Sequence, residues 1–189
     1  MSQKEKKLLY LAYGSNINLQ QMRYRCPTAK RVDAAMLHGY ELEFRGVATI
    51  VPKADAAVPV LAWELQPQDE KNLDRYEGFP HLYRKQMFEI EVGGKTYDAM
   101  AYVMTKMEIA PPSRAYYEGI LAGYLANGMD TSYLNAAVER SVQQSVYRSD
   151  IHASQDYDDE AELDESDESE LYDGCEDEDE DFDFGQSAE

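Results

Sequence analysis

Glu77 is the carboxylate whose local sequence best suits proton-transfer chemistry. It lies in "LDRYEGFP", in the last turn of a predicted short helix and among aromatic and apolar neighbours. The carboxyl end of a helix disfavours an exposed anion by about 0.3 to 1 kcal/mol, and apolar burial raises a carboxyl pKa further. A raised pKa would suit Glu77 to general acid–base catalysis. From these residues alone, a surface glutamate that pairs with Arg75 or Arg84 in solvent is the more common case.

A second candidate feature is the turn Gly14-Ser15-Asn16, which ends the apolar run of "YLAYGSN", residues 10–16. Gly, Ser and Asn are common in turns because they tolerate or imitate turn geometry. The same three residues leave backbone N–H groups available to an anion or a developing oxyanion. Taken alone, they leave both interpretations open, a plain turn and an anion cradle.

Strong motifs of other enzyme classes are absent from the sequence. It contains no Walker loop, GxSxG, HExxH or cysteine pair with metal-ligand spacing, and His38, His81 and His152 are isolated. We therefore expect no metal ion and no cofactor. Cys26 and Cys175 are too few for a disulfide framework and favour a reducing compartment, and Cys26 is interpreted as a small buried hydrophobe.

The charge of the chain is concentrated at its carboxyl end. The sequence has 37 Asp and Glu against 18 Lys and Arg, a formal net charge of −19. Residues 150–189 hold 20 of these acids and no Lys or Arg, which leaves 17 acids against 18 bases in residues 1–149. We predict one domain over residues 1–149 and an acidic, disordered tail over residues 150–189. Such a tail could simply be solvated, bind a basic partner or divalent cations, or imitate nucleic acid.

The amino-terminal apolar run is short. Basic residues precede it, as in a secretory signal, but it extends only from Leu8 to Tyr13. That length is below the core of a signal peptide and far below a membrane span. We therefore expect a cytoplasmic protein that contacts neither a membrane nor nucleic acid.

The elements that would position Glu77 and the turn follow from the apolar pattern. Strands are predicted at residues 8–13, 39–46, 47–52 and 58–65, the last half-buried with Trp63 inward, and as a hairpin of 82–92 with 95–105 around Gly93-Gly94. Helices are predicted within 16–26, within 66–78, from the N-cap Ser113 to Gly128, and over about 130–146. Because strands and helices do not alternate, we predict an α+β fold with a small mixed β-barrel and flanking helices.

Five short motifs, spread in order over most of residues 8–128, resemble the gamma-glutamylcyclotransferase family: "YLAYGSN", "GVATIV", "NLDRYEG", "AYVMT" and "APPSRAYYEGI". The resemblance implies a small mixed α/β barrel with a pocket at its mouth. It also implies an intracellular, metal-independent enzyme that acts on a small gamma-glutamyl compound. Such an enzyme converts the gamma-glutamyl compound to 5-oxoproline and releases an amine or amino acid.

The resemblance further implies which residues form the site. Glu77 matches the glutamate of the family motif "LDxxEG" and is implied to be the general acid–base. The turn at Gly14 is implied to hold the gamma-glutamyl part through its backbone. The implied substrate-binding residues are Tyr10, Leu11, Ala12, Tyr13, Gly14, Ser15, Asn16, Tyr83, Tyr102 and Tyr116.

The motifs leave the leaving group open. "GFPHLYR" is closer to the branch that acts on gamma-glutamylamines, whereas "YGSN" and "GVATI" are closer to the branch that acts on gamma-glutamyl amino acids. A basic group near residues 79–83, such as Arg45, Arg84 or Arg114, would favour an amino acid, and an apolar wall would favour an amine. Two non-enzymatic alternatives also stand: a gamma-glutamyl or carboxylate binding module, and a protein that acts through its acidic tail.

Overall fold

The computed structural model describes the backbone of residues 8–161 and the side chains of residues 9–148. The chain divides into two units, Met1–Ile151 and His152–Glu189. The sheet, the cavities and the candidate site all belong to the first unit. Most of the predicted acidic tail, residues 162–189, lies outside the described residues.

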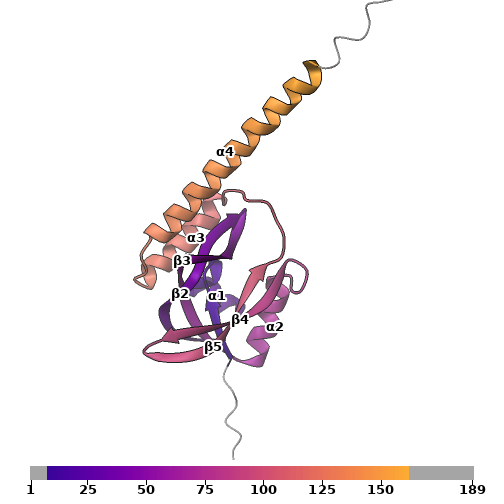
Figure 1. Cartoon of the computed structure of the whole chain (residues 1–189). Coiled ribbons are helices and arrows are strands. Elements are labelled where there is room, and N and C mark those ends of the chain that lie inside the picture. Colours follow the sequence, from indigo (N-terminus) through magenta and orange to yellow (C-terminus); the bar gives the residue numbers. More distant parts are fainter. Residues whose placement is uncertain (1–7, 162–189) are drawn as a thin grey trace, which may run out of the picture. The chain divides into compact units, whose positions relative to one another are not determined.

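The strands of the first unit form a single mixed sheet of five strands in the order β2-β3-β1-β5-β4. Figure 1 labels four of them, β2, β3, β4 and β5. Strands β1 and β5 are parallel, and the other neighbouring pairs are antiparallel. This arrangement confirms the predicted α+β class and the mixed sheet. The strands are β1 Leu8–Ala12, β2 Lys30–Arg45, β3 Val47–Leu65, β4 Tyr83–Val92 and β5 Lys95–Met104.

The sheet curls without a backbone ladder between its edge strands β2 and β4 in the described chain. Side chains join the two edges instead: Gln86 Nε2 donates to the Tyr40 hydroxyl at 3.1 Å. The rings of Tyr40 and Phe88 also pack edge to face, with centroids 5.1 Å apart. The predicted barrel is therefore an open, curled sheet whose edges meet through side chains.

Two long strands replace three of the predicted ones. The predicted strands 47–52 and 58–65 both belong to β3, and β2 begins at Lys30 rather than at residue 39. Pro52 was expected to end a strand, and it does not. Strand β1 pairs only with Leu61–Leu65, so Pro52 and Pro59 lie where one side of β3 lacks a neighbouring ladder and a missing N–H costs little. Trp63 is buried as predicted. Residues 58–63 are nevertheless buried on both faces, because β5, helix α2 (Pro67–Tyr76) and the short helix η1 (Ser15–Ile17) also contact β3.

The helices are η1 Ser15–Ile17, α1 Leu19–Arg25, α2 Pro67–Tyr76, α3 Arg114–Ala126 and α4 Ser132–Ala161. Asn18 caps α1 by accepting from Gln20 N and Gln21 N, and Ser113 caps α3, as predicted. Helix α4 continues past the predicted end near residue 146, so residues 150–161 of the expected tail are helical. No Gly or Pro ends the helix there, and extending an existing helix adds one hydrogen bond for each residue fixed.

The core lies between the curled sheet and helices α1, α2 and α3. Its fully buried members include Leu11, Ile17, Met22, Phe44, Leu61, Leu73, Ile120 and Tyr124. Cys26 is also buried, as predicted for a small hydrophobe. No helix in the described part of the chain is long and apolar enough to cross a membrane.

Candidate active site

Several elements meet around one small cavity: the end of β1, η1, the end of α2, strands β3, β4 and β5, and the start of α3. Its volume is about 30 Å³. The lining residues are Tyr10, Tyr13, Gly14, Ser15, Asn16, Ala48, Glu77, Tyr83, Tyr102 and Tyr116. The structure thus brings together Glu77, the turn and the three distant tyrosines named from the sequence. Leu11 and Ala12 are buried in the core and do not line the cavity, and Ala48 was not anticipated.

Glu77 is the C-cap of α2 and is held at the cavity by backbone and side-chain hydrogen bonds. Its N–H donates to Leu73 O at 2.8 Å, and its Oε1 accepts from Asn16 Nδ2 at 2.9 Å. Burial raises the pKa of Glu77 from 4.5 to about 7, against the lowering effects of the Asn16 hydrogen bond and the Arg25 charge. In the described chain Glu77 forms no ion pair with Arg75 or Arg84.

The turn approaches its neighbours so closely that a side chain at position 14 would be tightly crowded. A Cβ on Gly14 would lie 3.2 Å from the Cβ of Ala48 and 3.2 Å from the hydroxyl oxygen of Tyr116. The Tyr116 hydroxyl in turn accepts from the backbone N–H groups of Ala48 and Ser15. Glycine therefore allows the turn to form one wall of the cavity directly with its backbone.

Tyrosine hydroxyls form the rest of the polar wall. Three of them donate away from Glu77: Tyr13 to the Tyr102 carbonyl, Tyr83 to the Ala48 carbonyl at 3.1 Å, and Tyr102 to Asp74 Oδ1 at 2.6 Å. Burial is the largest cause that raises the pKa of each of the five cavity tyrosines, that of Tyr116 to about 12. These phenols remain neutral near pH 7, so Glu77 is the lining side chain that changes charge there.

A network of charged side chains lies behind Tyr102. Asp74, which accepts the Tyr102 hydroxyl, also pairs with Lys85 Nζ at 2.6 Å. Lys85 pairs equally closely with Glu70 Oε1, at 2.6 Å, and its ammonium lies 4.8 Å from the centre of the Phe79 ring. Both carboxylates lie on α2, and Lys85 lies on β4. The network therefore connects Tyr102, on β5, with helix α2.

Arg25 is a functional candidate that sequence reasoning missed. It is half-buried at the last residue of α1 and donates through Nη1 to Asn16 Oδ1 at 2.6 Å and to Ser15 Oγ at 2.9 Å. Its Nη2 donates to Gln21 Oε1 at 2.6 Å, and its guanidinium lies 3.7 Å above the centre of the Tyr76 ring. The one available sequence signal was the i, i+4 spacing from Gln21, which places both side chains on one helix face.

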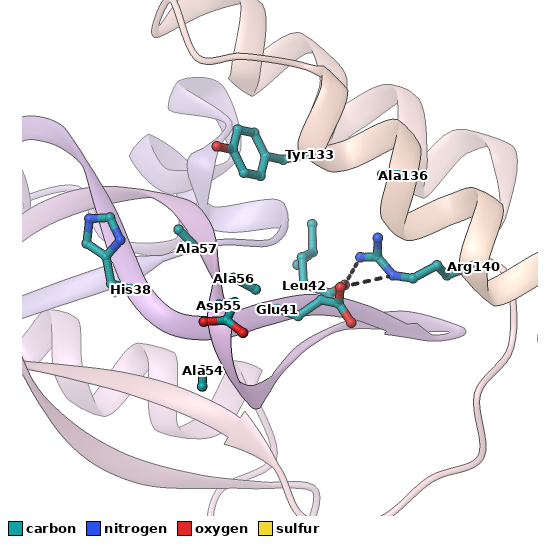
Figure 2. A pocket seen from close by; sticks show the side chains of 10 residues that line it. All are labelled: His38, Glu41, Leu42, Ala54, Asp55, Ala56, Ala57, Tyr133, Ala136 and Arg140. Atoms are coloured by element: carbon teal, nitrogen blue, oxygen red, sulfur yellow. Dashed lines mark hydrogen bonds and ion pairs between the residues drawn. The ribbon is translucent and has the colours of Figure 1, made fainter.

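A larger cavity, of about 470 Å³, lies between the β2–β3 hairpin and α4 (Figure 2). Its wall includes four alanines, and the guanidinium of Arg140 is engaged by Glu41 Oε2 at 3.5 Å and by the Leu42 carbonyl at 2.9 Å. None of the residues around Glu77 belongs to it. The smaller cavity at Glu77 is therefore the better candidate, because it combines a carboxyl of raised pKa with directed hydrogen-bond donors.

The described residues include no group of three or more His, Cys, Asp or Glu side chains that could hold a metal ion. The polar side-chain groups of the lining residues are the Glu77 carboxyl, the Asn16 amide, the Ser15 hydroxyl and neutral phenols. Such a set can move a proton and stabilise a developing negative charge on oxygen.

The chain is similar to known proteins over most of its first unit. Residues 10–124 match the family model described as gamma-glutamyl cyclotransferase, AIG2-like. The human protein named gamma-glutamylcyclotransferase is 30% identical over 145 residues, which cover 68% of this chain and 76% of that protein, and its mouse counterpart is 31% identical over 147 residues. A solved structure named gamma-glutamyl cyclotransferase superposes with a TM-score of 0.64 at 27% identity, covering 70% of this chain and 86% of that one. The chain therefore belongs to the gamma-glutamyl cyclotransferase, AIG2-like family.

Proposed function

We propose that this protein is a cytoplasmic cyclotransferase that converts a gamma-glutamyl amino acid or gamma-glutamylamine to 5-oxoproline, with Glu77 as the general acid–base. One observation carries the proposal. Glu77 lies at the cavity with a pKa raised to about 7 and with Asn16 Nδ2 2.9 Å from its Oε1. A carboxyl with such a pKa can both accept and return a proton near neutral pH.

The reaction needs one bond to form and one to break. The α-amino nitrogen of the substrate attacks its own γ-carbonyl carbon to close a five-membered lactam, and the bond from that carbon to the leaving nitrogen then breaks. Glu77 takes the proton from the attacking nitrogen and returns it to the leaving nitrogen. The nucleophile is already tethered to the carbonyl, and such tethering can contribute about 7 to 11 kcal/mol when the geometry is right.

Negative charge develops on the carbonyl oxygen as the lactam closes. We assign its stabilisation to the turn at Gly14-Ser15-Asn16, whose three residues line the cavity together with Glu77. The close approach of Gly14 to Ala48 and Tyr116 supports this role, because a side chain there would push the turn away from the cavity. Loss of one such donor typically lowers turnover by about 10² to 10³-fold.

The surroundings of Glu77 bear on the identity of the leaving group. None of Arg45, Arg84 and Arg114 lines the cavity, and the segment beyond Glu77 exposes the apolar side chains of Phe79 and Leu82. By the criterion of an apolar wall, these residues favour an amine. The relatives matched over most of their length carry the name gamma-glutamylcyclotransferase, which favours a gamma-glutamyl substrate without selecting the leaving group.

The test is a panel of gamma-glutamyl amino acids and gamma-glutamylamines, with 5-oxoproline and the released amine measured together. We expect turnover of at least one class, and loss of it in Glu77→Gln. The matched control is Glu91→Gln, an exposed carboxylate of β4 remote in sequence from the site, which should retain the activity of the parent. Binding across the panel without any 5-oxoproline would instead indicate a binding module, and full activity of Glu77→Gln would refute the assigned role.

A further inference from the structure

We propose that Arg25 is a positioning residue, which holds the side-chain amide of Asn16 in the orientation that directs an N–H at Glu77. The inference rests on the proposed function, since it assigns a task within the same site. It concerns a residue that does not line the cavity and that acts through another side chain.

The hydrogen bonds form a chain from Arg25 to Glu77. Nη1 of Arg25 donates to Asn16 Oδ1 at 2.6 Å, so this oxygen faces the guanidinium. The other end of the amide, Nδ2, then faces the cavity, where it donates to the Tyr10 hydroxyl at 2.8 Å and to Glu77 Oε1 at 2.9 Å. Both N–H groups and the oxygen of the Asn16 amide are thereby used in one orientation.

That orientation matters because an amide has a donor end and an acceptor end. If the Asn16 amide turned over, its oxygen would face the Glu77 carboxylate, and the two acceptors would repel each other. Its NH₂ would then face a guanidinium, which donates only. With Arg25 in place the reversed orientation loses favourable contacts at both ends, so the amide direction is fixed.

The surroundings of Arg25 show that its charge is directed at the site. Its hydrogen-bond acceptors are the neutral side chains of Ser15, Asn16 and Gln21, and in the described chain it forms no ion pair. The guanidinium is further held against the Tyr76 ring, 3.7 Å from its centre. The charge of a half-buried guanidinium is not neutralised by uncharged partners. The charge of Arg25 therefore acts on the Glu77 carboxyl and lowers its pKa.

Direct binding of substrate by Arg25 fits the structure less well. Ser15 and Asn16 line the cavity and accept the Nη1 hydrogen bonds, whereas Arg25 itself does not line it. A substrate-binding cation would leave its donors free for a carboxylate. Here three donor contacts are already made by the protein.

The experiment compares Arg25→Gln, Arg25→Lys and the control Arg23→Gln, an exposed arginine on the same helix. We expect Arg25→Gln to lower kcat by about 10- to 100-fold with KM changed by less than about threefold, since the amide that positions the catalytic group loses its anchor. Arg25→Lys should recover part of kcat, because a lysine restores the charge but not the planar fork or the ring contact. Arg23→Gln should match the parent. A raised KM with unchanged kcat in Arg25→Gln would overturn the inference in favour of substrate binding, and unchanged kinetics would also overturn it.

A second readout does not depend on turnover. The pKa of Glu77 can be followed by carbon-detected NMR of the labelled carboxyl group in the substrate-free full-length protein. We expect it to rise in Arg25→Gln, to return toward the parent value in Arg25→Lys and to be unchanged in Arg23→Gln. The other titratable side chains that interact with Glu77 have pKa values raised by burial and stay neutral over this range: Tyr10, Tyr13, Cys26, Tyr83, Tyr102 and Tyr116.

The two readouts separate two kinds of failure. If no gamma-glutamyl compound is turned over by the parent, the proposed function fails, while the NMR titration still tests whether Arg25 controls Glu77. If the parent is active and Arg25→Gln leaves both kcat and the Glu77 pKa unchanged, the positioning role fails and the proposed function stands. Sharp, dispersed NMR spectra of each variant show that it is folded.

Discussion

Replacing Glu77 by Gln should make the protein inactive and, above neutral pH, more stable. Burial raises the pKa of this carboxyl from 4.5 to about 7, so the folded state holds a proton that the unfolded state has already lost between these two pH values. The free energy of unfolding therefore falls as the pH rises through this range, and the full cost is present above pH 7. At about 1.4 kcal/mol for each pH unit, the cost of the charged form is about 3 kcal/mol.

Glutamine has nearly the same shape and stays neutral at every pH. Its side-chain oxygen can still accept from Asn16 Nδ2, which lies 2.9 Å from Oε1 in the parent. The variant should therefore avoid the cost of the buried charge without losing that hydrogen bond. For a domain of this size, about 3 kcal/mol corresponds to a rise in Tm of roughly 6 to 12 °C at pH 8, and the two proteins should differ little near pH 4. The turnover of the variant should be about 10² to 10⁴-fold lower than that of the parent.

The assay is thermal or denaturant unfolding of parent and variant in parallel, at pH values from 4 to 8. Because only one side chain differs, the large charge of residues 150–189 is common to both proteins and cancels in the comparison. A stability difference that does not grow between pH 4 and pH 8 would refute the raised pKa. Retained turnover of Glu77→Gln would separately refute its catalytic role.

Three further outcomes are expected. The parent kcat/KM for its best substrate should rise with pH through about 7, because Glu77 must be ionised to accept the first proton; a flat profile from pH 5 to 9 would contradict this. Gly123→Ala should lower the free energy of unfolding by about 1 to 3 kcal/mol and reduce activity, because its Cβ would lie 2.8 Å from Ile17 Cγ2 and 2.9 Å from Asn18 N, next to the turn. Chemical denaturation measures this loss of stability, and an unchanged denaturation midpoint would count against the packing. A chain that ends at residue 150 should fold and stay active by the 5-oxoproline assay; loss of activity in a folded truncation would show that the domain boundary is wrong.

The local sequence predicted most elements but not how far they extend. Turn and cap residues were reliable at Asn18, at Ser113 and at Gly93-Gly94, where a few adjacent residues decide the backbone path. The long strand β3 was not predicted as one strand, because the cost of a proline in a strand depends on whether a neighbour pairs with that edge. That neighbour, β1, is far away in the sequence.

The sequence by itself determined the candidate carboxyl, the turn and the order of motifs that resembles the family. Only the tertiary structure decided that Asn16 and Glu77, 61 residues apart, are joined by a hydrogen bond, and that burial raises the pKa of Glu77 to about 7. It also placed Arg25 behind Asn16 and Asp74 behind Tyr102, contacts that no local pattern indicated. The physical reason is that a pKa and a side-chain orientation depend on burial and on neighbours brought together by the fold, whereas strand periodicity, caps and turns depend on residues close in the chain.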